Sequence, residues 1–148
     1  MFDLSAYRRI VESATYHKFI GLALAEADAE KGIAVLHLPY RPDLAIFAEA
    51  GAWHGGVISA LIDAAGSVAC GLAVGRPMPT VNFRVDFLKS PVRVDLIATG
   101  RLVRAGRSVA MADVEVTDAA GALYAVGRGT FSVGSATRAV AGGAATAG

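Results

Sequence analysis

Apolar residues recur at helical spacing close to the start of the chain. Leu4, Tyr7, Ile10 and Val11 would share one face of a helix, and charged residues fill several of the positions between them. A short amphipathic helix is therefore predicted within residues 1–15.

Alternation of apolar and polar residues takes over after this helix. From Val81 to Phe87 the odd-numbered positions are apolar and the even-numbered positions are polar, which predicts a strand with one buried face. Turn sequences separate the other strands. Because these turns are short, the strands that they join should be antiparallel neighbours. The predicted strands are residues 19–27, 33–38 and 80–88, and three more within 92–133 that turns at 105–106 and 118–121 divide.

One long segment is apolar on every side. Between Gly55 and Gly75 the only charged residue is Asp63, and a run of about 20 apolar residues has the length of a membrane span. The segment is rich in Gly, Ala and Ser and stands among amphipathic strands, so we expect a core helix over residues 56–74 and no membrane. Such a helix has to be wrapped by a strongly curved sheet. The predicted fold class is α+β, in a single domain over residues 1–133.

Composition adds further expectations. Apolar residues make up 54% of the 148 residues and charged residues 18%, which predicts a second apolar surface, most simply an interface between copies of the chain. The net charge is +1, and the scattered Lys and Arg residues exclude the concentrated basic surface that nucleic acid requires. The N-terminus lacks the pattern of a secretion signal, so a cytoplasmic protein is expected. Residues 134–148, mostly Ala, Gly, Ser and Thr, are predicted to form a disordered tail.

The start of the apolar helix carries the sequence His54-Gly55-Gly56. Glycine lowers helix propensity, but it lets another group approach the backbone closely. The first turn of a helix has unpaired N–H groups, and one of them could stabilise the oxyanion that forms when a thioester carbonyl is attacked. The alternative is a plain loop-to-helix junction that needs small residues.

Asp63 is the second unusual feature, because a carboxylate among apolar residues is costly to bury unless something compensates. Burial would raise its pKa and make it a candidate general base, whereas the alternative is a structural Asp bonded to a neighbouring element. Gly55 and Asp63 are eight residues apart, which is about 12 Å along one helix. If both serve one carbonyl, Asp63 must come from a second copy that faces Gly55 across an interface.

The arrangement His-Gly-Gly, six residues and then Asp resembles the PaaI-like thioesterases of the hotdog superfamily. The likeness runs from Phe19 to Val133, with Thr80 opening the next strand and Ser90-Pro91-Val92 closing it. It implies a hotdog fold, in which a curved antiparallel sheet wraps a long central helix, and a homodimer or a dimer of dimers.

The resemblance also implies a reaction, the hydrolysis of acyl-coenzyme A by a water that Asp63 holds, with the carbonyl polarised at Gly55. His54 would position the thioester or the loop, and Thr80 would form a hydrogen bond near the water. Coenzyme A would enter as part of the substrate, with no separate cofactor. The residues expected to contact substrate are Trp53, Phe47, Glu49, Gly56 and two arginines, Arg104 and Arg107, that could grip a phosphate.

The chain departs from the family at one position. Many members carry an Asn or Gln six residues before the His, where this chain has Ala48, and the neighbouring Glu49 could take over part of that role. Two other functions stay open: a non-catalytic module that binds acyl-coenzyme A, and a dehydratase of the same fold. The histidines are not at metal-ligand spacing and Cys70 is the only cysteine, so no metal site is predicted. The acyl group and the arrangement of a tetramer are not indicated.

Overall fold

The structure is a computed structural model that describes residues 3–134. The tail predicted for residues 134–148 therefore lies, beyond Gly134, outside the described residues, as do residues 1 and 2 of the predicted first helix. In chain order the elements are α1 (Leu4–Ser13), α2 (Thr15–Ile20), β1 (Ala23–Asp28), β2 (Ile33–Leu38), the 3-10 turn η1 (Pro42–Leu44), α3 (Gly55–Val74), β3 (Thr80–Phe87), β4 (Leu96–Ala105), β5 (Val109–Thr117) and β6 (Leu123–Ser132).

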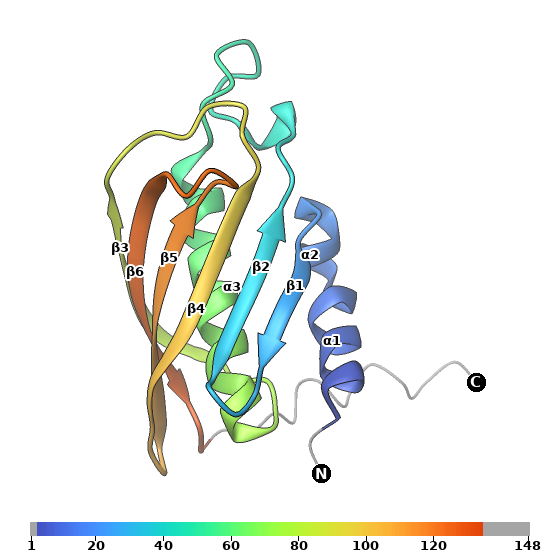
Figure 1. Cartoon of the computed structure of the whole chain (residues 1–148), viewed down its shortest axis with the longest axis vertical. Coiled ribbons are helices and arrows are strands. Elements are labelled where there is room, and N and C mark those ends of the chain that lie inside the picture. The colour runs from blue at the N-terminus through green and yellow to red at the C-terminus, as the bar shows by residue number, and fades with distance from the viewer. Residues whose placement is uncertain (1–2, 135–148) are drawn as a thin grey trace, which may run out of the picture.

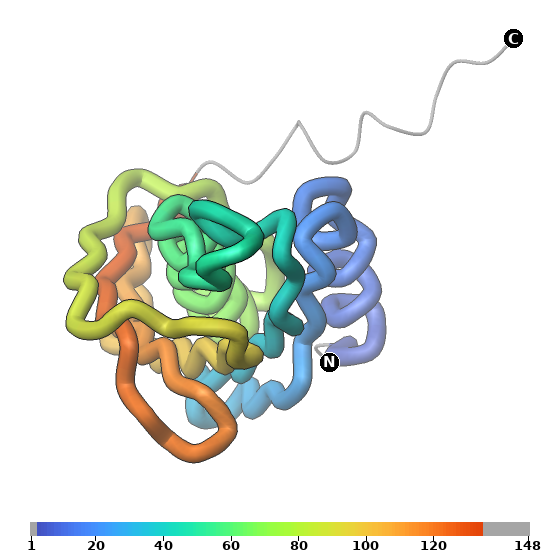
Figure 2. The backbone as a smooth tube through the Cα atoms, turned by 90° about the horizontal axis from the view of Figure 1, so that it is seen from above, coloured from blue at the N-terminus to red at the C-terminus, as the bar shows by residue number. Residues whose placement is uncertain are grey.

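The strands form one antiparallel sheet in the order β1-β2-β4-β5-β6-β3. The sheet curves around α3, with α1 and α2 beside β1 at one side and β3 at the other (Figures 1 and 2). The predicted α+β class, with a curved antiparallel sheet around a long helix, is confirmed. The hairpin turns follow their predicted positions, and the one between β5 and β6 depends on Gly121, whose φ of 82° favours glycine.

Helix α3 lies close against the sheet because small residues face one another. A Cβ on Gly100 of β4 would lie 2.3 Å from the Ala65 carbonyl oxygen, and one on Gly127 of β6 would lie 2.5 Å from the Ile62 side chain. By length and composition α3 could cross a membrane, yet 61% of its most apolar stretch is buried inside the folded chain. The long apolar segment is thus used as a core helix.

The N-terminal segment differs in part from its prediction. Helix α1 buries Tyr7 and Val11, which lie on the predicted apolar face. Helix α2 was not predicted, and because it continues to Ile20 the first strand begins at Ala23 rather than at Phe19. At six residues, α2 is too short to show a helical pattern.

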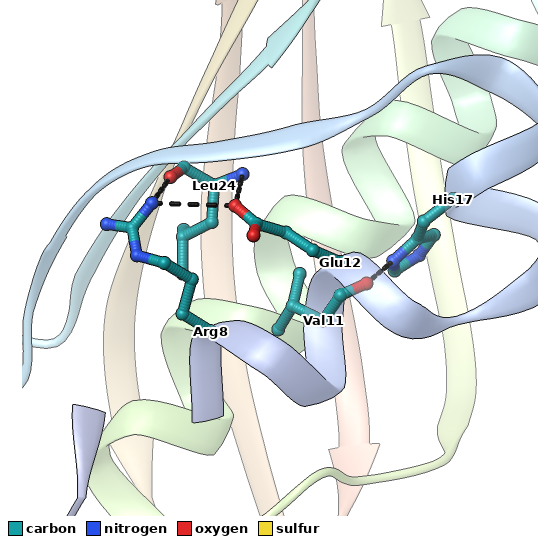
Figure 3. A network of polar contacts seen from close by, with 5 residues as sticks. All are labelled: Arg8, Val11, Glu12, His17 and Leu24. Carbon is teal, nitrogen blue, oxygen red and sulfur yellow. Dashed lines mark hydrogen bonds and ion pairs between the residues drawn. The ribbon is translucent and has the colours of Figure 1, made fainter. Parts of the chain in front are cut away.

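Side chains of α1 close the outer edge of β1 (Figure 3). The Leu24 N–H of β1 donates to Glu12 at 3.3 Å, and the Leu24 carbonyl accepts a hydrogen bond from Arg8. His17 of α2 donates from Nδ1 to the Val11 carbonyl at 2.7 Å and ties the two helices together. We call Arg8, Glu12 and Leu24 the β1 clamp.

Strand β3 lies at the opposite edge and is more exposed than its alternation predicts. Its apolar residues Val81, Phe83 and Phe87 are 57%, 40% and 55% exposed. The prediction of one buried face is wrong for the single chain, because within residues 3–134 β3 pairs only with β6 and little else covers it.

Candidate active site

His54 caps the start of α3 with its side chain. The ring Nδ1 accepts a hydrogen bond from the Gly56 N–H at 2.9 Å, so a neutral ring carries its proton on Nε2. A Cβ on Gly56 would lie 2.9 Å from the same nitrogen, which explains why a glycine stands there. The cap leaves the Nε2–H of His54 as the donor that can point to a ligand.

Gly55 is the first residue of α3, and its N–H finds no acceptor among the described residues. Its carbonyl accepts a hydrogen bond from Ser59 at 2.9 Å. The tip of the Phe87 ring, at the end of β3, lies 3.4 Å from where a Cβ on Gly55 would stand. The helix start thus presents an N–H beside an aromatic ring, at the positive end of the helix dipole.

Asp63 accepts a hydrogen bond of 2.7 Å from the Thr80 hydroxyl. Thr80 is the first residue of β3 and is exposed, and Asp63 is partly exposed rather than buried as its apolar neighbours predict. The structure brings together these two residues of the predicted site, and the sequence did not show that both are at least partly exposed. Within the described part of the chain, the second carboxylate oxygen of Asp63 has no hydrogen-bond donor and can bind a further partner.

The two halves of the predicted site do not meet within one chain. Gly55 and Asp63 occupy the same helix with Ser59 one turn from each, about 12 Å apart at 1.5 Å per residue. Ser59 was not singled out in the sequence, although Gly55, Ser59 and Asp63 follow one another at steps of four along an otherwise apolar helix.

A cavity of about 340 Å³ lies beside the helix start. It is lined by Ile46, Trp53, Gly55, Ile58, Phe87, Leu88, Lys89, Ser90 and Pro91. Trp53 was predicted to contact substrate and does line this cavity. Its walls are mostly apolar, and Gly55 is one of the residues that line it.

The profile of the thioesterase superfamily matches residues 50–125. A Halobacterium salinarum protein provisionally named an esterase is 36% identical over 126 residues, which cover 78% of this chain and 82% of that protein. This chain belongs to the thioesterase superfamily.

Solved structures agree with this assignment. A thioesterase-superfamily protein is 33% identical with a TM-score of 0.82, over 88% of this chain and 97% of that one. A variant of the phenylacetic acid degradation protein PaaI from Thermus thermophilus is 26% identical with a TM-score of 0.70, over 80% and 98% of the two chains. The PaaI-like hotdog fold is confirmed, and membership places the chain among thioester and ester hydrolases.

Trp53 forms a fixed wall of the cavity in this thioesterase-superfamily chain. Its side chain is 2% exposed, and its indole N–H donates to the Val94 carbonyl at 2.9 Å. The Tyr40 ring packs edge-on against the Trp53 ring, with the ring centres 5.7 Å apart. These contacts fix the orientation in which the ring faces the cavity.

Lys89 supplies the cation of the cavity wall. Its ammonium lies 5.4 Å from the centre of the Tyr124 ring. The Tyr124 hydroxyl donates to Asp118 at 2.7 Å and is the main reason why the pKa of that carboxyl lies below its usual value, with Lys89 adding to the effect. The sequence did not single out Lys89 or Phe87, and the only signal was their place between the alternating strand and Ser90-Pro91.

Other predicted contact residues lie apart from the cavity. Phe47 and Glu49 lie on the exposed loop before Trp53, and neither lines the cavity. The Glu49 carbonyl accepts a hydrogen bond from Arg93, which has a φ of 49° and also donates its N–H to Gly51 at 3.1 Å. These hydrogen bonds join the loop to the segment that follows β3.

Arg104 and Arg107 lie at the hairpin between β4 and β5, at the end of the molecule opposite the start of α3 (Figure 1). Within one chain they do not approach Gly55, so their predicted contact with a phosphate would need a second copy. Among residues 3–134, no group of three or more His, Cys, Asp or Glu side chains is placed to hold a metal ion.

A second cavity, of about 800 Å³, lies on the outer face of the sheet, away from α3. Four of its charged residues form two ion pairs, Arg128 with Asp113 at 2.5 Å and Arg84 with Asp86 at 3.0 Å. It contains neither Gly55 nor Asp63, so the smaller cavity is the better candidate for catalysis.

Proposed function

We propose that this chain is an acyl-coenzyme A thioesterase whose active site is shared between two copies. Water and an acyl thioester become a carboxylic acid and free coenzyme A. The C–S bond breaks, a C–O bond forms, and the thiol sulfur receives a proton. Coenzyme A is part of the substrate, and no separate cofactor takes part. We propose that the enzyme works in the cytoplasm, as its sequence suggested.

One observation supports this proposal most strongly: the two halves of the site lie at opposite ends of the open edge strand. Asp63 is bonded to Thr80, which begins β3, and the helix start at Gly55 contacts Phe87, which ends β3. An antiparallel pair of strands related by a two-fold axis sets the beginning of one beside the end of the other. Two β3 strands paired in this way would bring Asp63 of each copy towards Gly55 of the other.

Charge favours a particular register for that pairing. Arg84 and Asp86 share the outer face of β3 and bond to each other at 3.0 Å. A pair centred on Val85 would set Arg84 of one copy opposite Asp86 of the other. A shift of two residues either way would oppose two arginines or two aspartates, which is unfavourable. The centred register also brings Thr80 of one copy to Ser90 of the other, at the cavity wall.

The chemistry then divides between the copies. Asp63, oriented by the Thr80 hydroxyl, binds a water and takes its proton as the oxygen attacks the carbonyl. The Gly55 N–H of the other copy stabilises the oxyanion, and the Nε2–H of His54 is a second donor beside it. When the intermediate collapses, the thiolate leaves and Asp63 returns the proton to the sulfur.

A thiol-release assay tests the activity. Purified protein is mixed with acyl-coenzyme A esters from acetyl to dodecanoyl and with phenylacetyl and benzoyl esters, and free thiol is followed with a chromogenic reagent. Burial raises the pKa of the Cys70 thiol to about 12, so the protein itself should contribute little signal.

We expect the wild-type protein to release thiol. Asp63→Asn should lower the rate of release by about 10²- to 10⁴-fold, the usual contribution of a general base. Ligand-induced thermal stabilisation with no thiol released would instead identify a binding module. Loss of water from a 3-hydroxyacyl ester, followed by absorbance, would identify a dehydratase. Unchanged rates in the Asp63→Asn variant would contradict the mechanism.

A further inference from the structure

We propose that Phe87 sets the size of the acyl group that this site accepts, and that the accepted groups are compact. The inference rests on the proposed thioesterase function and adds to it a specificity-determining residue and a substrate class.

The size of the cavity beside Gly55 limits what it can hold. At about 340 Å³ it lies near the lower end of ligand cavities, which span about 300–1,000 Å³. Its wall is apolar except for Lys89 and Ser90. A short aliphatic chain or a single aromatic ring fits such a space, whereas a long fatty acyl chain would extend beyond the part of the site that one chain supplies.

Phe87 forms the wall of the cavity nearest to Gly55. Its ring tip lies 3.4 Å from where a Cβ on Gly55 would stand, in ordinary van der Waals contact. A thioester whose oxygen accepts from the Gly55 N–H therefore has the first carbons of its acyl group beside this ring. The Phe87 ring therefore limits how long and how wide the acyl group can be.

The other large walls are held more firmly. Trp53 is buried and bonded to the Val94 carbonyl, and Ile58 is buried in the core on α3. Phe87 lies at the end of an edge strand and is 55% exposed in the single chain, outside its core. A substitution at Phe87 changes the cavity without opening the core, so the position can set specificity while the fold is kept.

Substitutions of opposite size test the proposal. The kcat/KM of wild type, Phe87→Ala and Phe87→Trp is measured over acyl esters from acetyl to dodecanoyl. Phe87→Ala enlarges the cavity and should raise the ratio of long-chain to short-chain kcat/KM by roughly tenfold or more. Phe87→Trp should shift the ratio the other way. Phe19→Ala, which removes an exposed ring on α2, is the matched control and should leave the ratio unchanged.

The outcome separates specificity from structure. If both Phe87 variants lose activity in equal proportion on every ester, Phe87 supports the fold or the interface and the inference is overturned. The mass of each variant in solution is measured alongside, and if Phe87→Ala dissociates, Phe87→Leu and Phe87→Trp decide by the same ratio. A wild-type protein that is inactive on the whole panel is a different result, because it overturns the thioesterase proposal itself.

Discussion

The sheet ends in β1 on one side and in β3 on the other, and the two edge strands have different surroundings. At β1 the outward N–H and carbonyl of Leu24 bond to Glu12 and Arg8, so side chains of α1 stand where another strand would pair (Figure 3). At β3 no helix lies along the outer side in the described chain (Figures 1 and 2), and Val81 and Phe87 are more than half exposed.

An open edge strand with apolar side chains is a template for association, and proteins normally protect such edges. This chain protects one edge and leaves the other open. The open edge is also the one that carries both halves of the candidate site. We infer that the exposure of β3 belongs to function, and that the β1 clamp directs pairing to β3.

The largest effect on activity is expected from substitutions that remove either half of the shared site. Gly55→Pro removes the N–H while keeping a residue that suits the first helical position, and it should lower activity by about 10²- to 10³-fold. Asp63→Asn should be inactive as well. Mixed in equal amounts after unfolding and refolding together, the two inactive variants should regain about a quarter of wild-type activity, because half of the dimers then contain one intact site.

Two controls accompany this complementation. Gly55→Ala keeps the N–H and meets the Phe87 ring at an ordinary contact distance, so it should retain most activity. A chain that carries both substitutions should recover no activity when it is refolded together with either single variant. Failure of the separate variants to complement would show that the site lies within one copy.

A middle-sized effect is expected from the charges of the open edge. Arg84→Asp would oppose two carboxylates twice in the centred pair and should weaken the dimer by about tenfold. Adding Asp86→Arg restores opposite charges and should restore the affinity. Sedimentation at a series of concentrations measures both, and a double variant no tighter than the single one would rule out this register.

The smallest effect is expected at the closed edge. Arg8→Ala removes the hydrogen bond to Leu24 and should lower the free energy of unfolding by about 1 kcal/mol. Arg9→Ala removes an exposed neighbour on the same helix and should leave stability nearly unchanged. Denaturant unfolding compares the two variants, and both should keep wild-type specific activity. Equal stability of the two would show that the clamp contributes little.

Much of the fold could be predicted because it depends on local patterns. The turn at Gly121, the alternation in β3 and the start of α3 at His54-Gly55-Gly56 are signals that neighbouring residues carry. The sequence did not show that Phe83 is left 40% exposed, because alternation predicts an apolar face without saying whether the same chain covers it. Helix α2 was missed because one and a half turns carry no clear period.

The candidate site divides in the same way. His54, Gly55 and Asp63 stood out because their residue types are unusual at the start and middle of an apolar helix. Phe87 and Lys89 did not stand out, because their role depends on where the end of β3 lies relative to α3, and that is a tertiary contact.

The β1 clamp has a consequence for how far assembly can proceed. A sheet with two free edges can add subunits without limit and grow into a ribbon. Here a pair formed through β3 uses up both open edges and presents only β1 strands at its two ends, where Arg8 and Glu12 already occupy the outward groups of Leu24. In the proposed pair, growth by strand addition would therefore stop at two chains, and the six-stranded sheet of each would become half of a twelve-stranded sheet.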